Sequence, residues 1–309
     1  MHKEINQYMN VKEWIMLLFL SFIWGGSFFF NRIAVSELPP FTIVAYRLSI
    51  GALFLNLFIR MRGLRLPRSI GMWGSFYIMG LVNNAIPFTL IVWGQTSIAS
   101  GLASILNATT PFFTILIAHL FTSDEKITVN KVIGIVLGFG GVVVIIGADV
   151  FSTAQVLPQL AVLGAALSYA VSGVYGRRFR RMQLPSLTAA AGQVTASASL
   201  LIPAALLTGR PWEAGASSLP VLGSLVGLGL FSTSIAYIIY FTLLSRAGAT
   251  NLLLVTFLVP ITAILLGTFV LGEQLAANQL VGMVIVFVGL ISTNLRRSLF
   301  SFSRPVEKV

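Results

Sequence analysis

Apolar stretches of about 20 residues follow one another almost from one end of this chain to the other. A helix needs about 20 apolar residues to cross a bilayer core, and a membrane-spanning backbone must satisfy its own hydrogen bonds there. Charged residues make up only 9% of the 309 residues, whereas an ordinary soluble domain carries about 25%. The sequence therefore predicts an all-α integral membrane protein.

Charges, prolines and polar clusters divide the chain into ten predicted transmembrane spans. They cover residues 13–34, 40–60, 70–93, 99–122, 129–148, 157–176, 185–208, 219–243, 249–271 and 278–296. The first span is longer than the apolar region of a signal peptide and has no small-residue cleavage site after it, so we expect it to be retained. The connections are mostly too short for a soluble domain. We therefore predict a single transmembrane domain over residues 1–309.

The basic residues predict the orientation of the spans. Lysine and arginine are retained on the cytoplasmic side of a membrane protein. With the N-terminus inside, every lysine and arginine except Arg32, Arg47 and Arg210 falls on a cytoplasmic segment. We therefore expect both termini in the cytoplasm. The net charge of +11 comes in short bursts between apolar stretches, which predicts a lipid bilayer rather than a nucleic acid as the partner.

Two stretches of the chain repeat the same pattern of charge and glycine. The steps of nine and seven residues from Glu125 to Gly134 and Gly141 recur from Glu273 to Gly282 and Gly289. Further pairs occur at two other offsets. An offset of 149 matches Gly80, Leu81, Ile86 and Pro111 with Gly229, Leu230, Ile235 and Pro260. An offset of 146 matches Pro39, Thr42 and Ala45 with Pro185, Thr188 and Ala191. The chain is thus predicted to hold two five-span repeats, residues 12–148 (spans 1–5) and 156–297 (spans 6–10).

An odd number of spans in each repeat gives the second repeat the opposite orientation in the membrane. Ten transmembrane helices built as two inverted five-helix repeats are a common construction of secondary transporters. Such proteins bind a solute near the midplane and expose it alternately to the two sides. The repeat therefore predicts a small-molecule transporter.

The motifs also carry a family resemblance. The segments IWGGSFFFNRIAV (residues 23–35) and ELPPFTIVAYR (residues 37–47), with the paired glutamate and glycine pattern, resemble the EamA-type transporters of the drug/metabolite transporter superfamily. The resemblance implies export of small metabolites, often amino acids or related compounds. We expect the protein to act in a bacterial cytoplasmic (inner) membrane, as a monomer or weak homo-oligomer. The resemblance also implies a central cavity lined by spans 1, 3, 4, 6, 8 and 9. One departure is that the second repeat has Gln193 where the first has Arg47.

Polar and aromatic residues gather in those six spans. Prolines within the spans free the carbonyl four residues earlier, at Asn83, Asn107, Ser199 and Thr256. All four could serve only the kinked backbone, or Asn83, Asn107 and Thr256 could also face a solute. The predicted cavity residues are Trp24, Ser27, Asn83, Asn84, Asn107, Thr110, Tyr169, Ser172, Ser232, Tyr237 and Thr256. Apart from Arg47 this set has no fixed charge, which favours a zwitterionic or neutral solute.

Arg47 is the one basic residue well inside a predicted span. An unpaired charge at the bilayer centre costs about 2.5 to 3.5 kcal/mol even on a lenient scale. Arg47 lies about 10 Å along the helix from its external end. Its side chain could therefore snorkel outward or pair with carbonyl groups. The alternative is that it captures a substrate carboxylate or gates the cavity.

Several classes of site have no signal in this sequence. The chain has no cysteine, no acidic residue deep in a span, one histidine in a span (His119) and no GxxxxGK[ST] loop. We therefore expect no metal site, no cofactor and no enzymatic activity, and a proton relay of carboxylates is not indicated. An intramembrane lipid-modifying enzyme and a channel-like facilitator are the alternatives. Glu125 and Glu273 precede spans 5 and 10, where a helix dipole favours an acid, so we interpret them as structural.

The inverted repeat predicts which loops face outward. In a chain without native cysteine, cysteines introduced at Thr153 and Ser217 should react with an impermeant thiol reagent added outside intact cells, and cysteines at Ser69 and Ser303 should not. Labelling of Thr153 and Ser69 from the same side would contradict the inverted arrangement.

Overall fold

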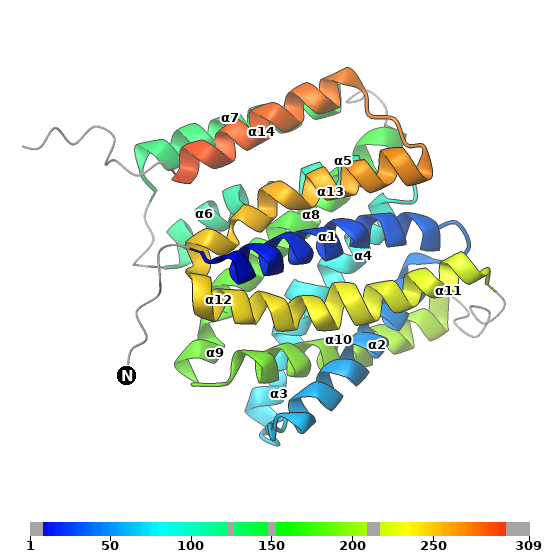
Figure 1. Cartoon of the computed structure of the whole chain (residues 1–309), viewed down its shortest axis with the longest axis vertical. Coiled ribbons are helices and arrows are strands. Elements are labelled where there is room, and N and C mark those ends of the chain that lie inside the picture. Colours follow the sequence, from blue (N-terminus) through cyan, green and yellow to red (C-terminus); the bar gives the residue numbers. More distant parts are fainter. Residues whose placement is uncertain (1–8, 123–126, 148–152, 209–216, 295–309) are drawn as a thin grey trace, which may run out of the picture.

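Within the described residues, the helices form ten spans that pack into one bundle. Figure 1 shows their arrangement. This computed structural model describes residues 9–122, 127–147, 153–208 and 217–294. The helices are α1 (Val11–Ala34), α2 (Pro40–Met61), α3 (Ile70–Gly80), η1 (Leu81–Ala85), α4 (Ile86–Gly94), α5 (Ser100–Asn107), α6 (Thr110–Phe121), α7 (Val129–Ile146), α8 (Thr153–Tyr175), α9 (Arg177–Arg181), α10 (Ser186–Thr208), α11 (Leu219–Val226), η4 (Gly227–Ile235), α12 (Ala236–Leu252), α13 (Leu254–Leu271) and α14 (Ala277–Asn294).

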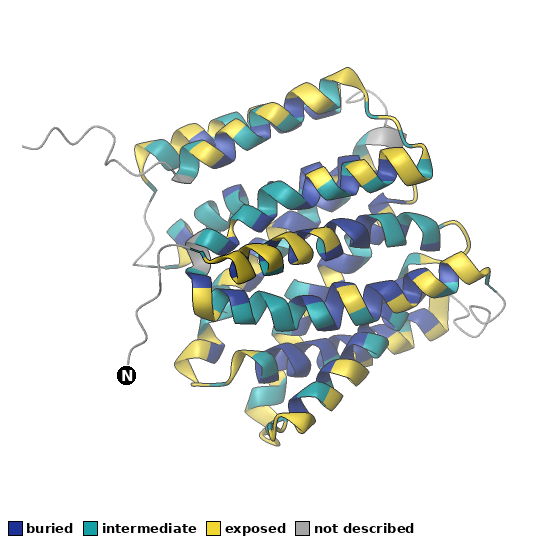
Figure 2. Ribbon diagram, viewed as in Figure 1, coloured by how far each residue is buried: buried dark blue, intermediate teal, exposed yellow. Residues whose placement is uncertain are grey.

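The outer surface of the bundle is apolar, as a bilayer requires. Within the described residues, nine helical stretches are long and apolar enough to cross a membrane, and Ala277–Thr293 adds a shorter one. Large apolar side chains such as Leu18, Val143 and Phe269 are exposed, while buried residues follow the faces where helices meet (Figure 2). The prediction of an all-α membrane protein with ten transmembrane helices is confirmed.

The two halves of the chain interlock in a reciprocal way. Helix α1, the first of the first half, packs against α13, the fourth span of the second half. In the same way α8, the first span of the second half, packs against α6, in the fourth span of the first half. The two second spans, α2 and α10, pack together, and so do the two fifth spans, α7 and α14. Helix α8 begins beside the end of α4, since Gly94 approaches the carbonyl of Pro158. The second half thus enters the bundle from the end at which α1 and α4 leave it.

The repeated glycines lie where α7 and α14 touch, at the outer edge of the bundle (Figure 1). A Cβ on Gly141 would lie 2.8 Å from the carbonyl oxygen of Gly282, and one on Gly282 would lie 2.7 Å from that of Gly141. Gly134 and Gly289 face each other in the same way, with 2.6 and 2.7 Å. The pattern occurs twice because each copy supplies one side of a close helix contact.

The structure differs from the predicted spans at the end of span 8. Helical structure continues from Ala236 to Leu252, beyond the predicted end at residue 243, with a kink at Gly248. Gly248 has φ 77°, ψ 170°, a backbone conformation that only glycine adopts readily. Span 9 then begins at Leu254 rather than at residue 249. The connection between the two spans is therefore a bend in a helix.

The glycine contact gives a prediction about stability. Gly141→Ala should lower the unfolding temperature in detergent, because overpacking a helix contact costs about 1 to 3 kcal/mol. Gly140→Ala is the matched control, because a Cβ on this neighbouring glycine meets nothing within 4 Å. That variant should be neutral or stabilising. Equal unfolding temperatures for the two variants would contradict the close packing of α7 on α14.

Candidate functional site

A cavity of about 800 Å³ lies inside the bundle, between the two halves. Its wall is built from both halves, including α1, α2 and α5 from the first and α8, α10 and α13 from the second. The volume is within the usual range of about 300 to 1,000 Å³ for small-molecule sites.

Nearly all of the predicted cavity residues line this one cavity. The wall includes Trp24, Ser27, Arg47, Asn83, Asn107, Thr110, Tyr169, Ser172, Ser232, Tyr237 and Thr256. Asn84 is fully buried behind the wall, where its Nδ2 donates to the Tyr237 hydroxyl at 3.0 Å. Ser199, the polar residue before Pro203, is exposed and lies outside the wall.

The Tyr237 hydroxyl connects several helices of the wall. It accepts hydrogen bonds from Nδ2 of Asn83 at 3.1 Å and of Asn84 at 3.0 Å. Asn83 in turn accepts a hydrogen bond from the Ser172 hydroxyl at 2.8 Å. These bonds hold η1, α8 and α12 together, and they use the tyrosine oxygen as an acceptor. The Tyr237 O–H therefore stays available as a donor.

Irregular backbone shapes the cavity at three places. The third span of each half contains a π-helical segment, η1 in the first half and η4 in the second. The fourth span of the first half breaks at Ala108 and Thr109, just before Pro111. Such segments widen or break a helix and leave backbone groups that need other partners. All three lie beside the cavity, which is where a membrane protein tolerates them.

The break before Pro111 shows whether the side chain of Asn107 serves the kinked backbone. The hydroxyls of Thr109 and Thr110 donate to the carbonyls of Leu106 and Asn107, at 2.6 and 2.7 Å. The side chain of Asn107 makes no hydrogen bond within the described part of the chain, and its Oδ1 is buried. Its amide group therefore does not serve the kinked backbone.

One end of the cavity is open beside α9. Arg180, Gln183 and Ser186 are exposed and belong to the wall. By the distribution of basic residues, this mouth corresponds to the predicted cytoplasmic side. Arg177 also lines it, so the entrance is positively charged.

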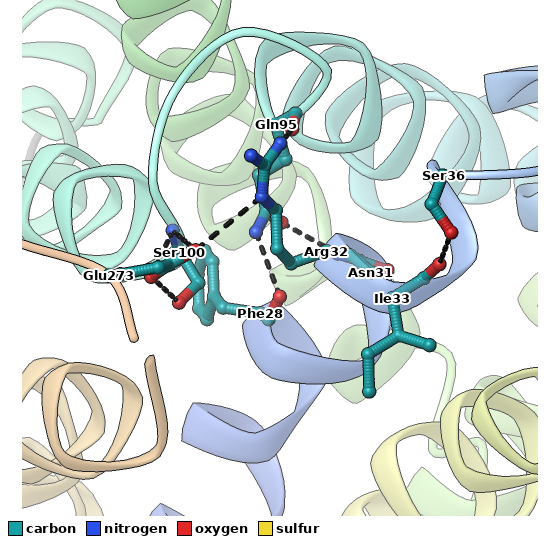
Figure 3. Close-up of polar contacts among 8 residues, drawn as sticks. All are labelled: Phe28, Asn31, Arg32, Ile33, Ser36, Gln95, Ser100 and Glu273. Carbon is teal, nitrogen blue, oxygen red and sulfur yellow. Dashed lines mark hydrogen bonds and ion pairs between the residues drawn. The ribbon is translucent and has the colours of Figure 1, made fainter. Parts of the chain in front are cut away.

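The opposite end is closed by a polar cluster that we call the Glu273 network (Figure 3). It consists of Asn31, Arg32, Gln95, Ser100 and Glu273. The Glu273 carboxylate accepts hydrogen bonds from the Ser100 backbone N–H at 3.0 Å and from the Ser100 hydroxyl at 2.5 Å, and it lies 3.6 Å from Nε of Arg32. Asn31 donates to Oε1 of Gln95 at 3.0 Å, and Arg32 donates to the Gln95 carbonyl at 3.0 Å. These contacts join α1, the start of α5 and the loop after α13.

A second contact lies at the same end of the bundle. The Ser218 backbone N–H donates to the Glu37 carboxylate at 2.9 Å. Hydrogen bonds from the Ser218 hydroxyl and backbone lower the pKa of Glu37 below its usual value. This contact connects the loop after α1 to the start of α11.

The structure corrects the interpretation of Glu273. Glu273 precedes predicted span 10, where the dipole of that helix would favour an acid, but α14 begins only at Ala277, and Glu273 directly follows the left-handed Gly272 that ends α13. Its carboxylate stabilises the N-terminus of α5 instead. Glu125, its repeat partner, lies outside the described residues. His119 is half-buried near the end of α6, where its Nδ1 accepts a hydrogen bond from Ile127 at 3.4 Å.

The structure bears on the two alternatives left open for Arg47. This side chain does not snorkel, since it is only 5% exposed and lines the cavity. Its Nε donates to the Thr233 hydroxyl at 3.1 Å rather than to a carbonyl, and its guanidinium lies 3.7 Å from the centre of the Phe88 ring. Sequence reasoning missed Phe88 and Gln193 as wall residues. A phenylalanine in an apolar span carries no signal of a site, and the sequence indicates Gln193 only as the counterpart of Arg47.

Comparisons with known proteins agree with this architecture. The model of the EamA-like transporter family matches residues 12–147 and 157–295. Over 302 residues the chain is 28% identical to "Uncharacterized transporter YoaV" of Bacillus subtilis (strain 168), covering 95% of this chain and 99% of that protein. It is 27% identical to "Uncharacterized inner membrane transporter YedA" of Escherichia coli (strain K12), covering 94% and 92%.

A solved crystal structure shares the fold. It superposes with a TM-score of 0.64 at 21% sequence identity, covering 93% of this chain and 98% of the other. The family match spans nearly the whole chain, in one copy for each half. The protein is a multi-pass membrane protein that belongs to the EamA-like transporter family.

Proposed function

We propose that this protein is a secondary transporter that exports small metabolites, amino acids or related zwitterions, across a bacterial cytoplasmic membrane. The observation that carries this proposal is a cavity between the two halves that is open beside α9 and closed by the Glu273 network. Two inverted repeats can exchange conformations, so that the cavity closes beside α9 and opens at the other end. This exchange is called alternating access. A channel-like facilitator would need a path open at both ends.

The chemistry of the wall supports a small polar solute. The wall contains the amide and hydroxyl groups of Asn107, Tyr237 and Ser232 together with aromatic rings such as that of Trp24. Such a wall offers hydrogen bonds for a polar head and apolar surface for a side chain. The wall within the described residues holds no carboxylate, so we propose that solute moves down its own gradient without a carboxylate proton relay.

Purified protein in proteoliposomes tests the function. We expect downhill flux of at least one labelled amino acid, and little flux of organic cations, because the fixed charges of the cavity are positive. The flux should persist when the pH gradient is removed or a protonophore is added. Transport of cations alone would overturn the substrate class. Loss of all flux with the protonophore would show a coupling site, and His119 would be examined first.

The Glu273 network gives a prediction about access. Glu273→Gln keeps the shape of the side chain but weakens the ion pair with Arg32 and the bonds from Ser100, and a hydrogen bond to a charged group is typically worth about 1.5 to 3 kcal/mol. We expect the state open at this end to become more populated. With a single cysteine at the cavity residue Ser27, an impermeant thiol reagent added to the Glu273 face should react about tenfold faster.

Glu13→Gln is the matched control for this experiment. Glu13 is also a buried acid, but it caps the start of α1 by accepting from the Asn10 backbone at 3.0 Å, away from the cavity. Its replacement should leave the labelling rate at Ser27 unchanged. Identical rates in the Glu273→Gln and wild-type backgrounds would show that the network is not the barrier at this end.

A further inference from the structure

Arg47 is a buried cation of the cavity wall that has no acidic partner. Three acids occur in the described part of the chain, and each is bound elsewhere. Glu13 caps α1, Glu37 binds Ser218, and Glu273 binds Ser100 and Arg32. The remaining acids of the sequence lie in the termini and connecting segments, outside the predicted spans.

The guanidinium of Arg47 has unused hydrogen-bonding capacity. Its Nε donates to the Thr233 hydroxyl, and one of its faces lies on the Phe88 ring. Neither Nη atom has an acceptor among the residues that the structure describes. Arginine is always charged and presents a planar fork of N–H donors that matches a carboxylate or phosphate. The contacts with Thr233 and Phe88 fix this fork in place at the cavity wall.

The two-fold repeat shows that the charge is not a requirement of the scaffold. Gly229 packs on the backbone of Arg47, with 3.1 Å between a Cβ there and the Arg47 carbonyl, and Gly80 packs in the same way on Gln193, with 2.6 Å. Gln193 also lines the cavity, where its Oε1 lies 3.5 Å from Nδ2 of Asn83. An uncharged amide therefore fills the equivalent position. The fold of the repeat therefore does not require a positive charge at this position.

We propose that Arg47 is the oxyanion-binding group of the cavity, which holds a carboxylate or phosphate oxygen pair of the transported solute through its Nη atoms. This inference rests on the proposed function and adds a required chemical group and a binding orientation. The anionic end of the solute faces Arg47, and its remaining polar groups face the amides and hydroxyls of the wall. Arg177 and Arg180 at the mouth add positive potential along the entry path.

Matched probes and variants test the oxyanion site. Purified protein is screened by thermal unfolding with the twenty L-amino acids, with their C-terminal amides, and with inorganic phosphate and glycerol phosphate. We expect acids of one oxyanion type to raise the unfolding temperature and the amides to have no effect. A response to amino acids identifies a carboxylate, whereas a response to the phosphates identifies a phosphate. Counterflow in proteoliposomes then measures the transport of each stabilising probe.

Arg47→Gln places in the first half the residue that the second half already has. It should reduce the apparent affinity for the stabilising acid about 10- to 100-fold, the usual effect of losing hydrogen bonds to a charged group. Arg47→Lys keeps the charge without the fork and should retain part of the response. Arg62→Gln is the matched control, because Arg62 caps the same helix and lies over Phe58 at 5.1 Å, outside the cavity. It should respond like the wild type.

The outcomes separate this inference from the proposed function. A purely structural role of Arg47 would lower the unfolding temperature of Arg47→Gln without probe and leave the affinity of the folded protein unchanged. That result, or equal responses to acids and amides, overturns the oxyanion site and leaves the transporter proposal standing. If no probe stabilises the wild type or is transported, the proposed substrate class fails and the oxyanion site fails with it.

Discussion

The structure depends on the rule that a backbone in a membrane must find all of its hydrogen-bond partners within the protein. Regular helices satisfy this rule by themselves, so any irregular segment has to border protein or a polar cavity. The π-helical segments η1 and η4 and the break at Ala108 and Thr109 all border the central cavity. The same irregularities that make a cavity possible thus also decide where it lies, because they cannot be placed against lipid.

Properties that are local in the sequence could be predicted, and properties that depend on how helices face one another could not. The spans follow from apolar length, and the polar residues near the prolines, such as Asn107, indicate the wall because an amide in an apolar span needs a partner. The position of Phe88 beneath Arg47 and the reach of Glu273 to Ser100 follow from the tertiary arrangement. The π-helix η4 has no proline at the position equivalent to Pro87, so no residue indicates it.

Duplication of the fold gives two equivalent backbones, whereas function requires that they differ. The glycine contacts of α7 with α14, and of Gly80 and Gly229 with the neighbouring helices, have counterparts in both halves. The side chains at the wall do not, since Arg47 in the first half corresponds to Gln193 in the second. A symmetric backbone permits two states of similar energy, and an asymmetric wall allows a solute to bind in one orientation. Symmetry is required of the backbone atoms and asymmetry of the side chains at the wall, so the two requirements do not conflict.

The contacts at the closed end have strengths that suit a reversible barrier. The Arg32 side chain is 41% exposed and its nitrogen lies 3.6 Å from Glu273, so this ion pair contributes about 0 to 1 kcal/mol. The hydrogen bonds from Ser100 to the less exposed carboxylate contribute more, about 1.5 to 3 kcal/mol each at most. Two states within a few kcal/mol of each other exchange readily, and a ligand can shift their populations only by its differential affinity. The few polar contacts of this barrier therefore add to the opening cost only an amount that binding of a small solute can offset.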